Sequence, residues 1–223
     1  MGYLDTVYSE AKRPRTSYPA QLVDYLCDRF KIGAGSRLLE CGHGRGEVLE
    51  AFSKRWITVY GIDREVVSDG YLAPHRILKV DMERDRFPFE DGYFDVVFSK
   101  SVIEHCHDPS HFLAESFRVL APGGRLIVMT PDWKSQMEIF YDDFTHRTPF
   151  TPDGLSDALE MFGIREVKVE KFYQLPIVWK YPALKWVCRF LQLIIPVRWK
   201  LKNKFLRWSV ELMILGTGVR HTP

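Results

Sequence analysis

The stretch Leu38–Phe52, LLECGHGRGEVLEAF, constrains the fold of this chain more than any other part of the sequence. Glycine occupies every second position at 42, 44 and 46, between a short apolar run and a segment with the pattern of a helix. Residues without a Cβ atom let the backbone approach a ligand closely. A glycine-rich turn between a strand and a helix therefore predicts an α/β fold that holds a nucleotide-like ligand at this turn.

Strand-like and helix-like segments alternate along the rest of the chain. We expect strands at 37–41, 57–62, 76–80, 94–98, 125–130 and 165–173, and helices at 17–30, 47–55, 109–120 and 151–163. Such alternation is typical of a parallel sheet that is covered by helices on both faces. Ligands of these sheets bind at the carboxyl ends of the strands. Residues that directly follow each strand are therefore the candidate site residues.

The chemistry around the glycines narrows the ligand. The dinucleotide fingerprint requires G-x-G-x-x-G, but here the spacing is G-x-G-x-G, and Glu47 stands where the third fingerprint glycine would be. Glu40 lies two residues before the first glycine. A carboxylate there disfavours a pyrophosphate and favours an ammonium group. The loop predicts a nucleoside that carries an amino acid, and the alternative is a packing turn without a ligand.

Two further acids stand where the next strands end. Asp63 closes the second strand and can accept both hydroxyls of a ribose. Asp81 follows the third strand and can accept from an adenine amino group, while Met82 can pack on the ring. The alternatives are a helix cap for Asp63 and an ordinary surface acid for Asp81.

Together these pieces resemble the class I S-adenosylmethionine-dependent methyltransferases, in their small-molecule (type 11) branch. The likeness covers about residues 17–172, and its most specific motifs are FPFEDGYFDVVFSKSVIEHCHDP at 87–109 and FRVLAPGGRLIVMTP at 117–131. The resemblance implies a Rossmann-like, doubly wound, mostly parallel sheet of seven strands with the last strand antiparallel. It also implies S-adenosyl-L-methionine as the cofactor, held by the residues Glu40, Gly42, Gly44, Gly46, Asp63, Asp81, Met82 and Ser99.

Within this likeness, Glu40 is expected at the cofactor amine and ribose, the three glycines at its methionine part, Asp63 at the ribose and Asp81 at the adenine. The sequence departs from the family in two places. Arg45 is large for a loop that the cofactor crowds, and no clear seventh strand follows Tyr173. Either that strand is degenerate or the tail replaces it. We therefore divide the chain into a methyltransferase domain, 1–172, and a helical appendage, 173–223.

We expect the methyl acceptor to bind near the stretch YDDFTHRTPFTPDGL at 141–155, which follows the fifth strand. We call this part of the site the acceptor side, and the cofactor part the donor side. Methylation of a hydroxyl needs a base that takes its proton. His146 with Asp143 as its orienting partner is one candidate, and His105 in the Glu104-His105 pair is another. The alternative is that these histidines only support the fold. Asp132, Asp142, Asp143 and His146 could bind a divalent metal, but their spacing is not diagnostic and we expect no metal.

The C-terminal part differs in charge from the rest. Residues 171–223 hold ten Lys/Arg and one acid, although the whole chain carries a formal charge of only +2. Two amphipathic helices are expected at 183–195 and 199–215, with Lys and Arg on one face and Trp, Phe and Leu on the other. This appendage could lie on a membrane surface through 183–215, close the substrate pocket as a lid, or form the face of a homodimer.

Further features of the sequence indicate the cellular compartment in which the protein is expected. The N-terminus has no apolar core of a secretion signal, and no uninterrupted apolar stretch is long enough to cross a bilayer. The four cysteines are scattered, with no CxxC pair, so neither a zinc site nor a disulfide framework is expected. We therefore expect a cytoplasmic protein that can also lie at the inner face of the membrane.

The sequence thus favours O-methylation of a small-molecule, sugar or lipid-linked acceptor. A quinone or lipid methylase at the membrane surface and a cofactor-binding module without turnover are the alternatives. Glu40 and the missing third glycine argue against a nicotinamide oxidoreductase. Nucleic acid is not expected as a partner, because the fourth strand is followed by Ser99-Lys100-Ser101 and not by the N-P-P-Y-like stretch of base methylases.

Overall fold

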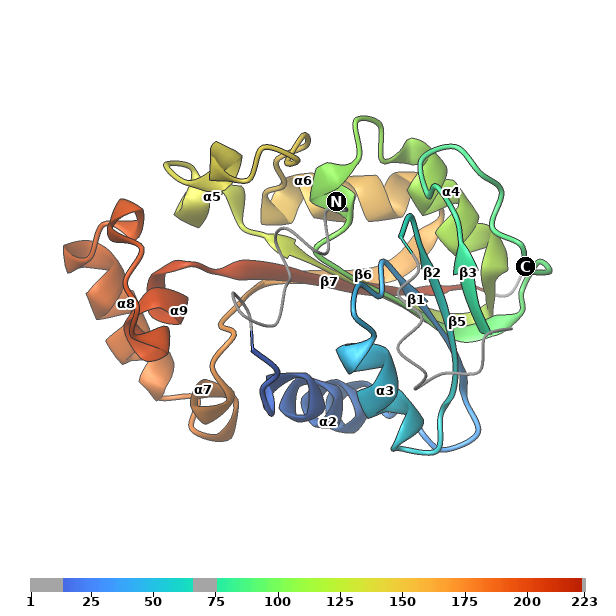
Figure 1. Ribbon diagram of the computed structural model, residues 1–223, viewed down its shortest axis with the longest axis horizontal. Coiled ribbons are helices and arrows are strands. Elements are labelled where there is room, and N and C mark those ends of the chain that lie inside the picture. Colours follow the sequence, from blue (N-terminus) through green and yellow to red (C-terminus); the bar gives the residue numbers. More distant parts are fainter. Residues whose placement is uncertain (1–13, 66–75, 222–223) are drawn as a thin grey trace.

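The computed structural model describes residues 14–65 and 76–221, so the N-terminal segment examined for a secretion signal lies outside the described residues. Its centre is one seven-stranded sheet with the order β3-β2-β1-β4-β5-β7-β6 (Figure 1). The strands are β1 (Arg37–Cys41), β2 (Thr58–Asp63), β3 (Ile77–Lys79), β4 (Phe94–Lys100), β5 (Leu120–Pro131), β6 (Ile164–Phe172) and β7 (Met213–Arg220).

Strands β1 to β5 pair in parallel, and β7 runs antiparallel to both of its neighbours, β5 and β6. The expected Rossmann-like, doubly wound, mostly parallel sheet of seven strands with an antiparallel last strand is therefore confirmed. Strand order reverses between β1 and β4, and ligands of such sheets bind at this switch point.

Helices cover both faces of the sheet (Figure 1). On one face α2 and α3 pack against side chains of β1, β4 and β5 that point to this face, such as Leu38, Phe98 and Ile127. On the other face α4 and α6 pack against the alternate positions, including Leu39, Val97 and Val128. These four helices are α2 (Tyr18–Phe30), α3 (Glu47–Ser53), α4 (Ser110–Val119) and α6 (Pro152–Met161). The two apolar layers hold the strand ends of the candidate site in fixed positions.

The connection after β5 is short and irregular. It contains α5 (Trp133–Gln136) and the 3-10 turn η3 (Phe140–Asp142), and it returns to the body of the molecule at Phe150, which bridges to Asp132. We call residues 133–147 the roof segment. A second 3-10 turn, η2 (Ile103–His105), follows β4 and lies beneath it, because the amides of Arg147 and Thr148 donate to the carbonyl oxygen of Glu104.

The C-terminal part corrects one expectation. The helix expected at 183–195 is present as α8 (Leu184–Ile194), preceded by α7 (Pro176–Lys180). The helix expected at 199–215 is wrong: the chain forms the turn η4 (Val197–Trp199), a short helix α9 (Lys204–Val210) and then β7. The seventh strand, which the sequence did not reveal after Tyr173, is therefore the end of the basic tail.

Two glycines of β7 allow neighbouring elements to pack closely against this strand. A Cβ atom at Gly216 would lie 2.8 Å from a methyl group of Leu155 on α6. At Gly218 it would lie 2.3 Å from a methyl group of Ile164 on β6. Only glycine lets α6 and β6 approach β7 this closely, so these positions favour close packing over strand propensity.

Two bulk expectations can be compared with the structure. All four cysteines are free and buried. Within residues 14–65 and 76–221, the structure contains no helix of the length and apolarity that a membrane span requires.

Candidate active site

Unpartnered polar atoms gather at the carboxyl end of the sheet. Among the described residues, seven buried side-chain oxygen or nitrogen atoms have no hydrogen-bond partner, and five of them lie at this end. Buried polar groups without partners are rare and costly, so a cluster of them indicates a place where a ligand supplies the missing bonds. The five belong to Glu40, His43, Ser99, Glu104 and Asp132.

The backbone of the glycine loop favours glycine, and Val102 packs closely against one of the three glycines. All three of its glycines have positive φ, and a Cβ atom at Gly42 would lie 2.1 Å from a methyl group of Val102. The Gly44 amide donates to the Oδ2 atom of Asp63 at 2.8 Å. Asp63, at the end of β2, therefore fixes the loop that follows β1. The structure brings the glycines, Glu40 and Asp63 together, as the sequence predicts.

Glu40 is the most unusual group of this side. It is only 3% exposed, and its Oε2 atom has no partner within the described part of the chain. Burial, together with the nearby charge of Asp63, raises the pKa of the Glu40 carboxyl well above its ordinary value, although Lys100 acts in the opposite direction. A buried carboxyl with a raised pKa is stabilised in its charged form when a cation binds beside it. Glu40 is therefore suited to an ammonium group.

His43, a residue of the glycine loop that the sequence patterns did not single out, also lies in this site. Its ring covers Gly61, where a Cβ atom would lie 2.9 Å from the ring. Its Nδ1 atom lies 2.9 Å from the carbonyl oxygen of Gly44, and its Nε2 atom is buried without a partner. Burial lowers the pKa of His43, so the ring is neutral near pH 7. One sequence feature is consistent with this placement: a histidine in the loop after β1 and a glycine in β2, against which the histidine ring can pack.

The other expected cofactor residues occupy different environments. Asp81 accepts hydrogen bonds from the Arg64 guanidinium, at 3.0 Å, and from the Glu83 amide. Met82 is buried in the apolar layer under α4 rather than standing free. Ser99 is fully buried on β4 beside Cys41 of β1 and points an unpartnered hydroxyl into the structure. Arg45, large as it is, pairs with Glu47 at 2.9 Å.

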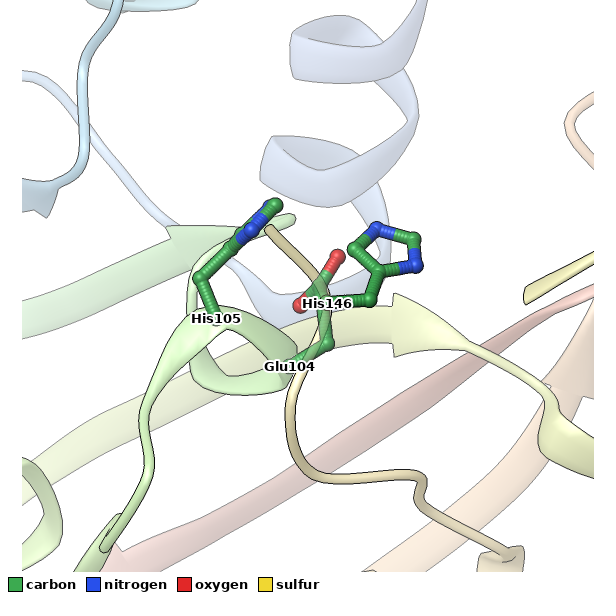
Figure 2. Close-up of side chains that lie close together, drawn as sticks. All are labelled: Glu104, His105 and His146. Atoms are coloured by element: carbon green, nitrogen blue, oxygen red, sulfur yellow. The ribbon is translucent and has the colours of Figure 1, made fainter. Parts of the chain in front are cut away.

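The acceptor side is built around Glu104 of η2. The side chain is fully buried, and its Oε2 atom accepts a hydrogen bond of 3.0 Å from the Thr130 hydroxyl on β5. Burial raises the pKa of Glu104 to about 7. Figure 2 shows its carboxylate in the same view as the rings of His105 and His146, which are 4.9 Å apart at their centroids. In the sequence, Glu104 was only part of a motif that resembles the family. In the structure it lies at the centre of this cluster.

Hydrogen bonds define the proton positions of both imidazoles. The Nδ1 atom of His146 lies 2.6 Å from the carbonyl oxygen of Phe140, which only accepts, so Nδ1 carries the proton. The Thr145 hydroxyl donates to Asp143 at 2.6 Å and therefore accepts from Nδ1 of His105 at 2.9 Å. In the neutral rings the lone pair is on Nε2 in both cases. Burial, with His146 nearby, lowers the pKa of His105 and favours its neutral form.

This geometry changes the roles expected of two residues. The bond that orients His146 comes from a backbone carbonyl, and Asp143 instead orients Thr145 and, through it, His105. Two of the four residues considered as metal ligands form ion pairs with lysines instead, Asp132 with Lys171 at 3.1 Å and Asp142 with Lys200 at 2.8 Å. The described residues that could share a cation are Glu104, His105 and His146, whose ligand atoms lie within 4.8 Å of one another.

Comparisons with known proteins agree on one kind of enzyme. Residues 39–128 match the family described as a methyltransferase domain. A probable S-adenosylmethionine-dependent methyltransferase of Mycolicibacterium smegmatis is 30% identical over 145 residues, which are 64% of this chain and 50% of that protein. A ubiquinone biosynthesis O-methyltransferase of Pseudomonas fluorescens is 29% identical over 118 residues, covering 48% of this chain and 49% of that protein. The chain thus spans about half the length of these curated relatives.

The fold has a similar counterpart among solved structures. Phosphoethanolamine N-methyltransferase 2 of Haemonchus contortus, in complex with S-adenosyl-L-methionine, superposes with a TM-score of 0.66 and covers 99% of this chain and 59% of that one. The two sequences are 16% identical, so the likeness concerns the fold alone.

Proposed function

We propose that this chain, which belongs to the class I S-adenosylmethionine-dependent methyltransferases, methylates a hydroxyl group of a small-molecule, sugar or lipid-linked acceptor. The single observation that supports a hydroxyl acceptor is the pair of imidazoles beside Glu104, each with its Nδ1 proton engaged by a fixed acceptor. A hydroxyl needs a positioned base, whereas more nucleophilic acceptors do not. The similarity to a ubiquinone biosynthesis O-methyltransferase favours the same acceptor atom.

The residues on the donor side fit the family's cofactor. The unpartnered Oε2 atom of Glu40 offers a charge for the ammonium group of an amino-acid moiety, and the three glycines with positive φ follow it in the chain. Asp63 has a carboxylate beside the same loop. When bound, S-adenosyl-L-methionine supplies a methyl group that a sulfonium activates. The remaining task of the protein is to orient the acceptor and to take its proton.

His146 is the proposed base. Its Nδ1–H donates to the Phe140 carbonyl, and this bond holds the ring with Nε2 as its basic atom. His105, held in the same tautomer by Thr145, and Glu104, with its raised pKa, can then share the proton that Nε2 receives. The fixed rings lower the cost of orienting the base when the acceptor arrives.

Calorimetric titration tests the donor assignment first. The protein is expected to bind S-adenosyl-L-methionine and not NAD, and the reverse result would refute the proposal. Turnover is then measured with methyl-labelled cofactor against sets of phenols, sugars and polyprenyl quinones, followed by mass shift. Cofactor binding with no transfer to any hydroxyl acceptor would favour the alternative of a binding module without turnover.

A further inference from the structure

Helix α8 presents an apolar face to solvent. Its positions 186, 187, 190, 193 and 194 repeat at helical spacing and form one continuous stripe. On this stripe Trp186 is 71% exposed, Phe190 61% and Leu193 83%. The opposite side of the helix carries Cys188, which is buried in the small apolar cluster under α9, and Gln192, which donates to the Ser209 carbonyl. The exposed stripe is therefore not the face with which α8 holds the fold together.

Charge around the stripe has one sign. Residues 174–210 contain eight Lys/Arg and no Asp/Glu. Lys185 and Arg189 flank the stripe on α8 itself, and the Arg189 guanidinium lies 4.8 Å from the Trp186 ring centroid. Exposed cations also precede and follow the helix, at Lys180, Arg198, Lys202 and Lys204. An apolar stripe with a Trp at its boundary and a rim of cations is complementary to an anionic bilayer surface.

The roof segment continues this surface. Lys200, which directly follows the exposed Trp199, forms an ion pair of 2.8 Å with Asp142 of η3. Tyr141 and Phe144 stand on either side of Asp142 and Asp143 in the chain, and they are 57% and 75% exposed. In Figure 1, α5 and α8 lie at the same end of the molecule. The roof segment and the helices α8 and α9 thus lie toward one end of the protein.

We propose that the protein docks on the surface of an anionic lipid bilayer through the exposed face of α8, with the roof segment turned toward the same bilayer. Trp186, Phe190 and Leu193 enter the interface between headgroups and acyl chains, and the flanking cations contact anionic headgroups. Docking requires neither cofactor nor turnover, so it goes beyond the proposed function. Where that function holds, this end of the protein is the one through which a lipid-linked acceptor reaches His146.

Co-sedimentation of the full chain with vesicles tests this proposal. We expect binding to phosphatidylcholine vesicles that contain phosphatidylglycerol, weak binding to phosphatidylcholine alone, and loss of binding as salt is raised. The double change Trp186→Ser, Phe190→Ser is expected to lower the affinity by roughly 30-fold or more, because interfacial affinity scales with buried apolar area. Changing both Lys185 and Arg189 to Gln is expected to lower it about fivefold per cation.

Trp56→Ser is the matched control. Trp56 is 83% exposed and follows α3, on a part of the molecule far along the chain from α8, so this variant is expected to bind vesicles like the unchanged protein. Phe144→Ser is expected to weaken binding by a smaller factor than the α8 double change. Equal binding of all variants, or no binding of the unchanged protein to anionic vesicles at low salt, overturns the proposal.

Sedimentation velocity separates the bilayer from a second copy of the chain. A monomer that binds vesicles supports docking. A dimer that the α8 double change converts to monomers, with no vesicle binding by either form, overturns it and assigns the stripe to a subunit interface. Because none of these measurements involves methyl transfer, their failure and the failure of the proposed function are distinguishable.

Discussion

The two sides of the site are built by opposite means. On the donor side, Oε2 of Glu40 and Nε2 of His43 are buried without partners, beside a loop of three glycines with positive φ. On the acceptor side, the two imidazoles are already held by hydrogen bonds to Phe140 and Thr145. The first arrangement leaves hydrogen bonds for a ligand to supply, whereas in the second the two imidazoles are already oriented and the unpartnered atom is Oε1 of Glu104. Substitutions on the two sides should therefore affect binding and rate separately.

The largest effect is expected from His146→Ala. Loss of the base should lower kcat for a hydroxyl acceptor by about 10²- to 10⁴-fold. The dissociation constant of S-adenosyl-L-methionine, measured by calorimetry, should stay within about twofold, because the donor side is untouched. His107→Ala, which removes an exposed imidazole two residues from His105, serves as the control. A large loss of cofactor affinity in His146→Ala would break the separation of the two sides.

A pH effect on stability is expected from Glu104. Its pKa rises from 4.5 to about 7 on folding, so the folded state holds a proton that the unfolded state releases between these values. This stabilisation is complete below pH 4.5 and is lost as pH rises through 7, and it amounts to about 3 kcal/mol. Glu104→Gln should reduce the difference in the free energy of unfolding between pH 5 and pH 8 by about 2.5 kcal/mol and leave the part that comes from the raised pKa of Glu40. Denaturant titrations at both pH values measure this free energy. An unchanged difference in the variant would contradict a raised pKa of the buried Glu104 carboxyl.

Glu40→Gln tests the donor side directly. Removing the charge that faces an ammonium group should weaken binding of S-adenosyl-L-methionine about 10- to 100-fold. Binding should also release protons, because the raised pKa of Glu40 must fall when a cation docks beside it; calorimetry in buffers of different ionisation enthalpy detects this. Glu138→Gln, at an exposed position of the roof segment, is the control. Equal affinity of both variants would place the amine elsewhere.

The smallest effect on stability and cofactor binding is expected from substitutions on the exposed face of α8, outside the candidate site. Trp186→Ser with Phe190→Ser should change the free energy of unfolding by less than about 0.5 kcal/mol, because both side chains are exposed. Cofactor affinity should be unchanged as well. Thermal and denaturant unfolding measure the first quantity. A loss of several kcal/mol would show that the stripe packs within the fold and is not a free surface.

Sequence patterns were sufficient to expect that the proposed donor-side residues lie close together, because these residues stand at the ends of neighbouring strands. Glu40, the three glycines and Asp63 follow successive strands, and parallel strands bring their carboxyl ends to one edge. The acceptor side was predicted only in part. His146 and Asp143 lie in irregular backbone, where spacing does not determine which side chains meet. The link from Asp143 through Thr145 to His105 spans 40 positions of the chain, and no periodicity encodes it.

Strand β7 escaped prediction for a different reason. The residues that precede β7 have cations and aromatic residues at helical spacing. The two glycines within β7 lower its strand propensity. The strand exists because it pairs on both edges, with β5 and with β6. Tertiary pairing of this kind outweighs local preference, and a single sequence does not display it.

The pairing of β6 with β7 also bears on how this architecture can be altered. Phe172, the last residue of β6, is the register partner of Met213, the first residue of β7. The 40 residues 173–212 therefore leave the sheet and return to it at neighbouring points. A connection of this kind is tolerant of length, since doubling a loop costs only about 0.6 kcal/mol. Residues 173–212 can thus be regarded as an exchangeable insertion, because a different segment could connect the same two strands while the sheet stays unchanged.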